Sequence, residues 1–337
     1  MNMFNKLYTN TKKYIKENIV FLLIILLYVL IVNVKLPFSI ESPGGLININ
    51  DRLSGNIYNS KGSINLTYVT VRDGTIPNLI IAALNKDWDI ISNNNIKLDN
   101  ETMKESLIRS RLEYDASVNS SYYVAYNYAN LDPKILDSNI YVEYILEEAN
   151  TDIQVGDKII EFDDRKMNNI TDFYSYIQNL NIGDEVKFIV ENNKKHYKRT
   201  ANIIEYEGNK MIGITIINIP NIEVENKITY KSEDNENGPS GGLMFTLSIY
   251  NAITEYDITN GYKISGTGTI NMDGTIGIIG GVKYKLAGAV KKNADIFIAP
   301  SENYEEALEL KKKNKYDIKI VKADTFEEAL EELKKLK

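Results

Sequence analysis

Two residues of this 337-residue chain could together carry out nucleophilic chemistry. Ser240 stands in Asn-Gly-Pro-Ser-Gly-Gly-Leu, and Lys283 follows 43 positions later in Gly-Gly-Val-Lys. A serine hydroxyl is a poor nucleophile until a base removes its proton, and the usual base is histidine. The single histidine, His196, falls in a predicted exposed hairpin with no glycine-flanked serine nearby. We therefore expect a lysine to be the base, and the pair predicts a serine–lysine dyad.

A lysine acts as a base only if its pKa falls from about 10.4 towards 7 or 8, a change of roughly 4 kcal/mol. The apolar, glycine-rich approach at 276–281 predicts burial of Lys283, and the positive end of a predicted helix at 282–291 also disfavours its charge. Ser240 likewise precedes a predicted buried helix at 241–253, whose first N–H groups could receive an oxyanion. Alone, such a serine is usually a turn residue and such a lysine is usually solvated, so the prediction depends on the pair.

Three glycine-rich motifs around this pair resemble the Lon-type serine protease domain. They are Gly-Pro-Ser-Gly-Gly-Leu at 238–243, Gly-Thr-Gly-Thr-Ile at 266–270 and Gly-Gly-Val-Lys at 280–283. The resemblance covers roughly residue 212 to the C-terminus. It implies an α/β fold of the α+β kind and hydrolysis of peptide bonds by the dyad of Ser240 and Lys283.

The same resemblance implies supporting roles for three further residues. Thr267 would hold the lysine amine through its hydroxyl, and the alternative is an ordinary strand threonine. Gly238 and Gly241 flank the nucleophile, and the family usually has alanine where Gly241 stands. We expect this small change beside the serine to leave the chemistry intact.

Residues 132–207 resemble a PDZ domain of the bacterial protease type, most specifically in Val-Gly-Asp-Lys-Ile-Ile at 155–160. We expect this domain to be β-rich with two helices. It would be inserted into the Lon-type domain, with residues 36–131 as the N-terminal part of that domain and residues 208–337 as its catalytic part.

Peptide capture is the function that a PDZ domain implies, because such domains add an extended peptide as a strand to a sheet edge. The residues expected to receive it are Ile140, Tyr141 and Val142, on the first predicted strand of the domain. No Gly-Leu-Gly-Phe-like loop precedes Ile140. A rigid spacer or a gate over the active site is therefore the alternative role.

Lysines followed by an apolar run open the chain and predict a membrane anchor. A transmembrane helix at 18–35 would span about 27 Å at 1.5 Å per residue, against a hydrocarbon core of about 30 Å. The preceding lysines place residues 1–17 in the cytoplasm and the rest of the chain outside a cell membrane that is crossed once. A cleaved signal peptide is the alternative, although no Ala-x-Ala site follows and the first alanine is Ala82.

Composition excludes several other classes of protein. The net charge of −7 and the lack of a basic stripe argue against nucleic acid as a partner. One histidine and no cysteine leave no metal site to predict, and no Gly-x4-Gly-Lys motif indicates a nucleotide site. We expect no cofactor. Tail-specific PDZ proteases also use serine and lysine, but they lack these glycine-rich contexts.

The sequence therefore predicts a membrane-anchored, ATP-independent serine endopeptidase that cleaves peptides, or regulatory exported or membrane proteins, at the extracytoplasmic face. The alternative is a membrane-tethered PDZ peptide-binding protein whose protease fold is inactive. The sequence leaves open the substrate, the cleavage site and whether the chain forms a homo-oligomer.

Overall fold

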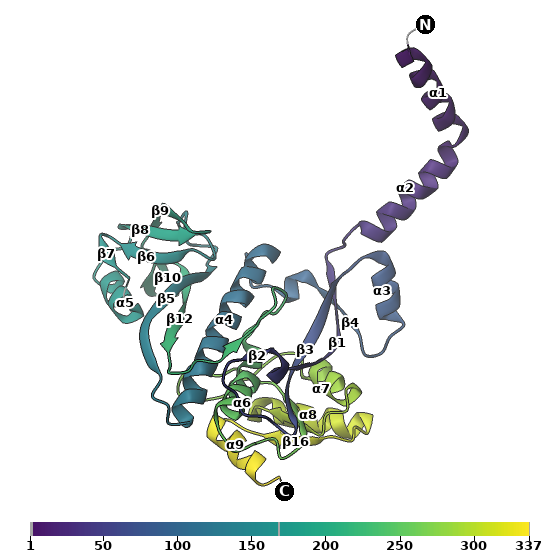
Figure 1. The fold of residues 1–337 in the computed structure, drawn as a ribbon. Coiled ribbons are helices and arrows are strands. Elements are labelled where there is room, and N and C mark those ends of the chain that lie inside the picture. The colour runs from purple at the N-terminus through teal and green to yellow at the C-terminus, as the bar shows by residue number, and fades with distance from the viewer. Residues whose placement is uncertain (1–2, 168, 337) are drawn as a thin grey trace. The chain divides into compact units, whose positions relative to one another are not determined.

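The computed structural model describes residues 3–167 and 169–336 (Figure 1). The chain divides into two compact units. The smaller unit is Met1–Ser42 with Thr70–Ile96, and the larger is Pro43–Val69 with Lys97–Lys337. Strands β1 (Phe38–Asn48) and β3 (Ser63–Asp73) each contribute residues to both units.

The smaller unit holds the N-terminal helices and a short antiparallel pair of strands, β1 and β4. In this pair Phe38 lies opposite Ser92 and Glu41 lies opposite Asp89. Its other elements are α1 (Met3–Glu17), α2 (Ile19–Asn33), α3 (Ile76–Ala83), β4 (Asp89–Ser92) and η2 (Asn93–Asn95). Helix α2 is apolar almost throughout and has no buried residue. Within the described part of the chain, no helix by itself has the length and apolar character to cross a bilayer. The segments Lys6–Glu17 and Ile19–Asn33 are joined at a 75° bend, and only together do they reach the required length and apolar character.

The larger unit contains a sheet with the strand order β16, β15, β14, β3, β1. Its strands from β16 to β3 run parallel to one another. Its strands beyond β1 and β3 are β14 (Lys263–Gly266), β15 (Ile296–Ala299) and β16 (Lys319–Lys322). The helices of this region are α4 (Met103–Tyr128), η3 (Pro239–Gly241), α6 (Gly242–Ile253), α7 (Val282–Lys291), α8 (Ser301–Asn314) and α9 (Phe326–Lys334). Short pieces are η1 (Asn50–Arg52) and the paired strands β2 (Leu53–Ser54) and β13 (Thr229–Tyr230).

Alternation along β15 explains why helices cover both faces of this sheet, because successive side chains of a strand point to opposite faces. Ile296 and Ile298 join a core with α6 and α9, whereas Phe297 and Ala299 join a second core with α7 and α8. All four are fully or almost fully buried. The catalytic region predicted from the sequence is thus a mixed α/β layer structure, as expected.

The predicted PDZ region forms its own antiparallel sheet in the order β12, β5, β6, β8, β9 around a separate apolar core. Its strands are β5 (Lys134–Ile145), β6 (Lys158–Phe162), β7 (Arg165–Lys166), β8 (Glu185–Asn192), β9 (Lys195–Asn202), β10 (Ile204–Tyr206), β11 (Asn209–Met211) and β12 (Ile214–Glu223). Of the two helices expected there, the described residues form only α5 (Ile170–Gln178). The stretch 146–157 instead makes turns, with Gly156 at φ +91°.

Candidate active site

Ser240 lies in the middle of the 3-10 turn η3, directly before the buried helix α6. Gly238 precedes this turn at φ +83°, a conformation that side chains disfavour, so glycine lets the chain enter the turn. Ser240 is half-buried. At the beginning of a helical segment, the first N–H groups have no acceptor within the helix and point outward. The N–H groups of Gly242 and Leu243, at the start of α6, already donate to the carbonyl oxygens of Pro239 and Gly268, so a carbonyl oxygen bound at Ser240 would have to be received by the turn η3 itself.

Thr267 joins this turn to the central sheet. It follows β14, which ends at Gly266, so Thr267 lies just beyond the strand and is fully buried. Its hydroxyl donates a hydrogen bond of 3.0 Å to the carbonyl oxygen of Ser240. The N–H of Gly268 donates to the same oxygen at 2.9 Å. The turn that contains Ser240 is thus fixed to the end of β14 by two hydrogen bonds.

The amine that reaches Thr267 belongs to Lys285. Its Nζ donates to Thr267 Oγ1 over 3.1 Å, and the side chain is only 4% exposed. Burial lowers the pKa of Lys285 from 10.5 to about 8, because the charged form loses its hydration. Roughly one fifth of this amine is therefore neutral at about pH 7.4, against less than about 0.1% for an unshifted lysine, and the neutral amine is the state that a general base requires.

The structure places Lys283, the predicted base, elsewhere. Both lysines lie on α7, and two residues of an α-helix are about 200° apart around its axis, so they point to nearly opposite sides. Lys283 is partly exposed, and its Nζ lies 5.4 Å from the centre of the Tyr284 ring. Lys285 replaces Lys283 as the candidate base.

A signal for this assignment was present in the sequence as helical periodicity. Val282, Leu286 and Ala289 are buried at the spacing of one helix face, and Lys285 falls on that face between them. The motif-based prediction took the first lysine after the paired glycines. The face of the helix, rather than the distance from the motif, determines which amine enters the core.

Packing around Gly241 leaves little room for a side chain. A Cβ atom at this position would lie 2.6 Å from Leu66 Cδ1 and 3.0 Å from Phe245 Cε2. Gly242 is confined more strictly, since an added Cβ would lie 2.8 Å from the backbone nitrogen of Ile270 as well as 2.6 Å from Ser117 Oγ. The glycine pair thus lets the start of α6 approach its neighbours closely.

Neither histidine chemistry nor a metal cluster is assembled by the described residues. His196 lies in the β8–β9 hairpin, beside a turn at Asn193 and Lys194, and its side chain is 65% exposed. Over 3–167 and 169–336, no group of three or more histidine, cysteine, aspartate or glutamate side chains could hold a metal ion.

Residues 233–335 match the family described as the Lon protease (S16) C-terminal proteolytic domain, and residues 132–203 match the PDZ domain family. This chain contains a Lon proteolytic domain and a PDZ domain. The two parts of the resemblance found in the sequence are therefore confirmed. The Lon match includes the turn at Ser240, Thr267 and helix α7.

Named relatives agree with the Lon match over a short stretch. A Lon protease of Desulfatibacillum aliphaticivorans is 32% identical over 75 residues, which are 22% of this chain and 9% of that protein. A Lon protease of Mesomycoplasma hyopneumoniae (strain 232) is 30% identical over 80 residues, which are 24% of this chain and 9% of that protein. The matches thus span about a tenth of the length of these relatives.

Similar solved structures include PDZ domains of two SdrC-like proteins. The domain from Listeria monocytogenes is 23% identical, covering 25% of this chain and 93% of that chain at a TM-score of 0.22. The domain from Listeria innocua is 25% identical, covering 23% of this chain and 92% of that chain at a TM-score of 0.22.

Strand β5 of the PDZ domain offers no free edge at the predicted peptide-binding residues. Tyr141 and its neighbours pair with β12 on one side and with the β6 segment on the other, where Val142 and Asp157 share a backbone hydrogen bond of 2.9 Å. Ile140 and Val142 are buried in the core of the domain, at 1% and 0% exposure. The expected contribution of these residues to peptide capture is therefore corrected: they hold the sheet together.

A groove of about 200 Å³ lies instead between α5 and β12. Its apolar lining includes Phe173, Ile177, Met211, Ile212, Ile214 and Ile216. Among the described strands, β12 pairs only with β5, so its other edge is unpaired. Gly213, at φ +73°, turns the chain into this strand. A free edge beside an apolar groove is what an added peptide strand requires.

Proposed function

We propose that this chain is a membrane-anchored serine endopeptidase that works without ATP, with Ser240 as nucleophile and Lys285 as general base. The observation that carries the proposal is the hydroxyl of Thr267, which contacts both the buried amine of Lys285 and the carbonyl of Ser240. The Lon match supports serine protease chemistry at this site.

In the proposed reaction, the neutral Lys285 amine takes the proton of the Ser240 hydroxyl as Oγ forms a bond to the substrate carbonyl carbon. Backbone N–H groups around Ser240 stabilise the oxyanion. Lys285 then donates its proton to the leaving amine, and the peptide bond breaks to give an ester on Ser240. Water attacks this ester, Lys285 accepts the proton of the water and returns it to Ser240 Oγ, and the second product leaves.

The proposal is tested by mixing the full chain in detergent with a serine-reactive fluorophosphonate and, separately, with a mixed peptide library, without nucleotide. We expect phosphonylation at Ser240, located by mass spectrometry, and cleavage of a subset of peptides. The Ser240→Ala variant defines the background of both assays. Absence of label and of cleavage in the wild type would favour the alternative, a tethered PDZ peptide-binding protein with an inactive protease fold.

We also propose that the PDZ groove captures substrate by adding a peptide strand to β12. Aspartate at Ile216 would place a charge in the apolar groove, whereas aspartate at the exposed, outward-facing Thr215 is a matched control on the same strand. Binding of library peptides with free apolar carboxyl ends should weaken at least about tenfold in Ile216→Asp only. Equal affinity in both variants, measured by fluorescence anisotropy, would place the peptide elsewhere.

The anchor is proposed to be helix α2, with residues 1–17 in the cytoplasm and the catalytic domain outside. Support comes from the exposed apolar side chains of α2 and from the lysines that precede it. The chain has no cysteine, so a single introduced cysteine reports its own position. In intact cells, an impermeant maleimide should label Ser175→Cys on exposed α5, but Thr11→Cys only after permeabilisation. Recovery of the chain in the soluble fraction, or the reverse labelling, would contradict the proposal.

A further inference from the structure

The segment before Ser240 is held by one buried carboxylate. Residues 231–235 and Asn237 are exposed, whereas Glu236 between them is only 8% exposed. A glutamate is rarely this buried without partners, because losing water destabilises its charged form. The side chain of Glu236 is therefore the point at which an otherwise solvated loop enters the protein.

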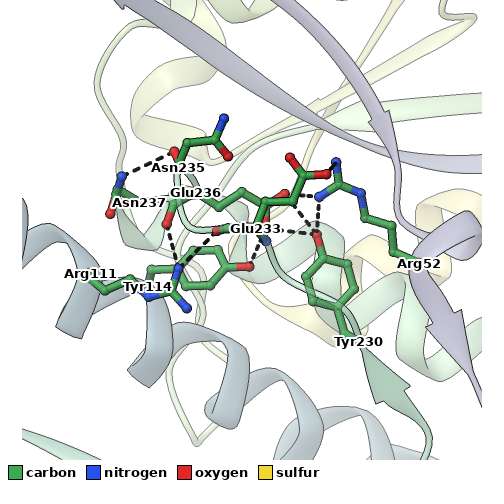
Figure 2. Close-up of polar contacts among 8 residues, drawn as sticks. All are labelled: Arg52, Arg111, Tyr114, Tyr230, Glu233, Asn235, Glu236 and Asn237. Atoms are coloured by element: carbon green, nitrogen blue, oxygen red, sulfur yellow. Dashed lines mark hydrogen bonds and ion pairs between the residues drawn. The ribbon is translucent and has the colours of Figure 1, made fainter.

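Four groups from different parts of the larger unit converge on the Glu236 carboxylate (Figure 2). The Tyr114 hydroxyl, on α4, donates to Oε2 over 2.7 Å, and the Tyr230 hydroxyl, on β13, lies 3.2 Å from the same oxygen. Arg52 forms an ion pair with Oε1. The N–H of Glu233 donates to Oε2 over 3.3 Å, which closes the loop on itself. Both carboxylate oxygens are thus satisfied by fixed donors.

The two tyrosines act as donors throughout the physiological pH range. Burial is the largest cause that raises the pKa of Tyr114 well above its ordinary value, and the bond to Glu236 raises it further. Burial also raises the pKa of Tyr230 to about 12. Both therefore keep their hydroxyl protons beside the carboxylate, and the cluster does not exchange its donors as the pH changes.

Helix α4 holds the backbone of the same loop. Arg111 Nη1 donates to the carbonyl oxygens of Glu233 and Glu236, each over 3.2 Å. The N–H of Gly238 donates to the carbonyl oxygen of Ser110 over 2.8 Å. These contacts fix the loop on the residues immediately before the nucleophile.

The contacts with α4 continue past the nucleophile. Ser117 Oγ donates to the carbonyl oxygen of Pro239 over 3.0 Å, and Ser121 Oγ donates to that of Gly242 over 3.0 Å. Ser240 is therefore flanked on both sides by carbonyls that α4 orients. Since Glu236 is the only charged side chain buried in this loop, it fixes how the loop enters this set of contacts.

We infer that Glu236 is a positioning residue for catalysis: its buried carboxylate, bound by Arg52, Tyr114 and Tyr230, sets the backbone geometry from residue 236 to Ser240. This inference rests on the proposed function of Ser240. Glu236 is four residues from the nucleophile and acts through the main chain between them. Displacing a reacting group by 1 Å can cost about 100-fold in rate, so a loop that loses this anchor is expected to slow the acylation step.

The test compares Glu236→Gln with Glu233→Gln in the full chain. The two variants make the same change of charge three residues apart. Both carboxylates pair with Arg52, but the Glu233 side chain is 58% exposed, so its ion pair is solvated and worth little, whereas Glu236 is buried. The rate of Ser240 phosphonylation should fall at least about tenfold in Glu236→Gln and stay near wild type in Glu233→Gln. Hydrogen exchange over 231–239 should become faster in Glu236→Gln alone. In peptide cleavage, the loss should lie in kcat, with KM little changed.

Two further variants separate positioning from a general loss of stability. Tyr114→Phe removes the hydroxyl that donates the 2.7 Å hydrogen bond to Glu236 and keeps the ring. It should slow phosphonylation in the same direction, with no additional loss in the double variant Tyr114→Phe/Glu236→Gln. Val321→Ala, in the core on β16, serves as a destabilised control that should keep the wild-type rate per folded molecule.

The outcomes distinguish this inference from the proposed function. If the wild type reacts with the phosphonate and Glu236→Gln reacts as fast, or if Val321→Ala slows equally, Glu236 is not a positioning residue. If the wild type itself does not react, the proposed function fails. In that case, unchanged hydrogen exchange over 231–239 in Glu236→Gln would show that the Glu236 carboxylate does not hold the loop either. Faster exchange would show that it holds the loop, whatever the loop does.

Discussion

Lys285→Met should lower kcat/KM for peptide cleavage at least about 1,000-fold, because loss of the base can cost a serine hydrolase about a million-fold in kcat. Methionine has a similar length and keeps the apolar contacts of the side chain, but it cannot accept a proton. Lys283→Met is the matched control on the same helix, and it should stay within about threefold of wild type, as substitutions outside a functional contact usually do. Initial rates on one library-derived peptide measure both.

Ser240→Ala should lose activity to the same extent as Lys285→Met, and the double variant should lose no more. Residues that act as one unit in a proton-transfer step are strongly non-additive, because removing either partner already abolishes the step. A large loss in Lys283→Met with retained activity in Lys285→Met would return the role of base to Lys283. Additive losses in the double variant would show that the two residues do not share a step.

The sequence was sufficient to predict the glycine-rich turn at Ser240 and most of the elements around it, for local reasons. Ser240 lies in a short glycine-rich turn before an apolar helix, and both features are readable within a dozen residues. Helix α7 was predicted at its observed bounds, Val282–Lys291. Choosing between two lysines of one helix requires knowing which face is buried. That follows from periodicity only when the helix is examined as a whole.

Contacts between distant segments explain what sequence reasoning could not find. The partners of Glu236 come from η1, α4 and β13, the most distant of them 184 positions away, and nothing local distinguishes this glutamate from its exposed neighbours. Strand order in the PDZ domain is equally non-local. Alternation predicts that Ile140 and Val142 lie on one face of a strand, but it cannot show that both edges of β5 are paired.

The pH dependence of activity should follow the buried amine. With the pKa of Lys285 lowered to about 8, kcat/KM should rise about 50-fold between pH 6 and pH 8 and level off above pH 9, because only the neutral amine is a base. The profile should be measured under conditions in which acylation limits the rate, such as phosphonylation of Ser240. Lys283→Met should keep the same profile. A flat profile between pH 6 and pH 9 would argue against an amine as the base.

The same shift should appear in the stability of the fold. In the folded chain the pKa of Lys285 is about 8, and its ordinary value of 10.5 applies when the chain unfolds. Between these values the unfolded chain binds a proton that the folded chain does not, so stability falls as the pH decreases from 10.5 to 8 and is then constant. The lost stability amounts to roughly 3 kcal/mol.

Lys285→Met cannot take up this proton, so it should be more stable than wild type at pH 7 and lose that advantage towards pH 10.5, in urea unfolding at several pH values. Lys283→Met serves again as the control and should show no such pH-dependent gain. A residue whose removal abolishes activity while it stabilises the fold is retained for chemistry rather than for packing. A Lys285→Met variant that is less stable than wild type at pH 7, and equally so at pH 10, would show that the lysine serves the core.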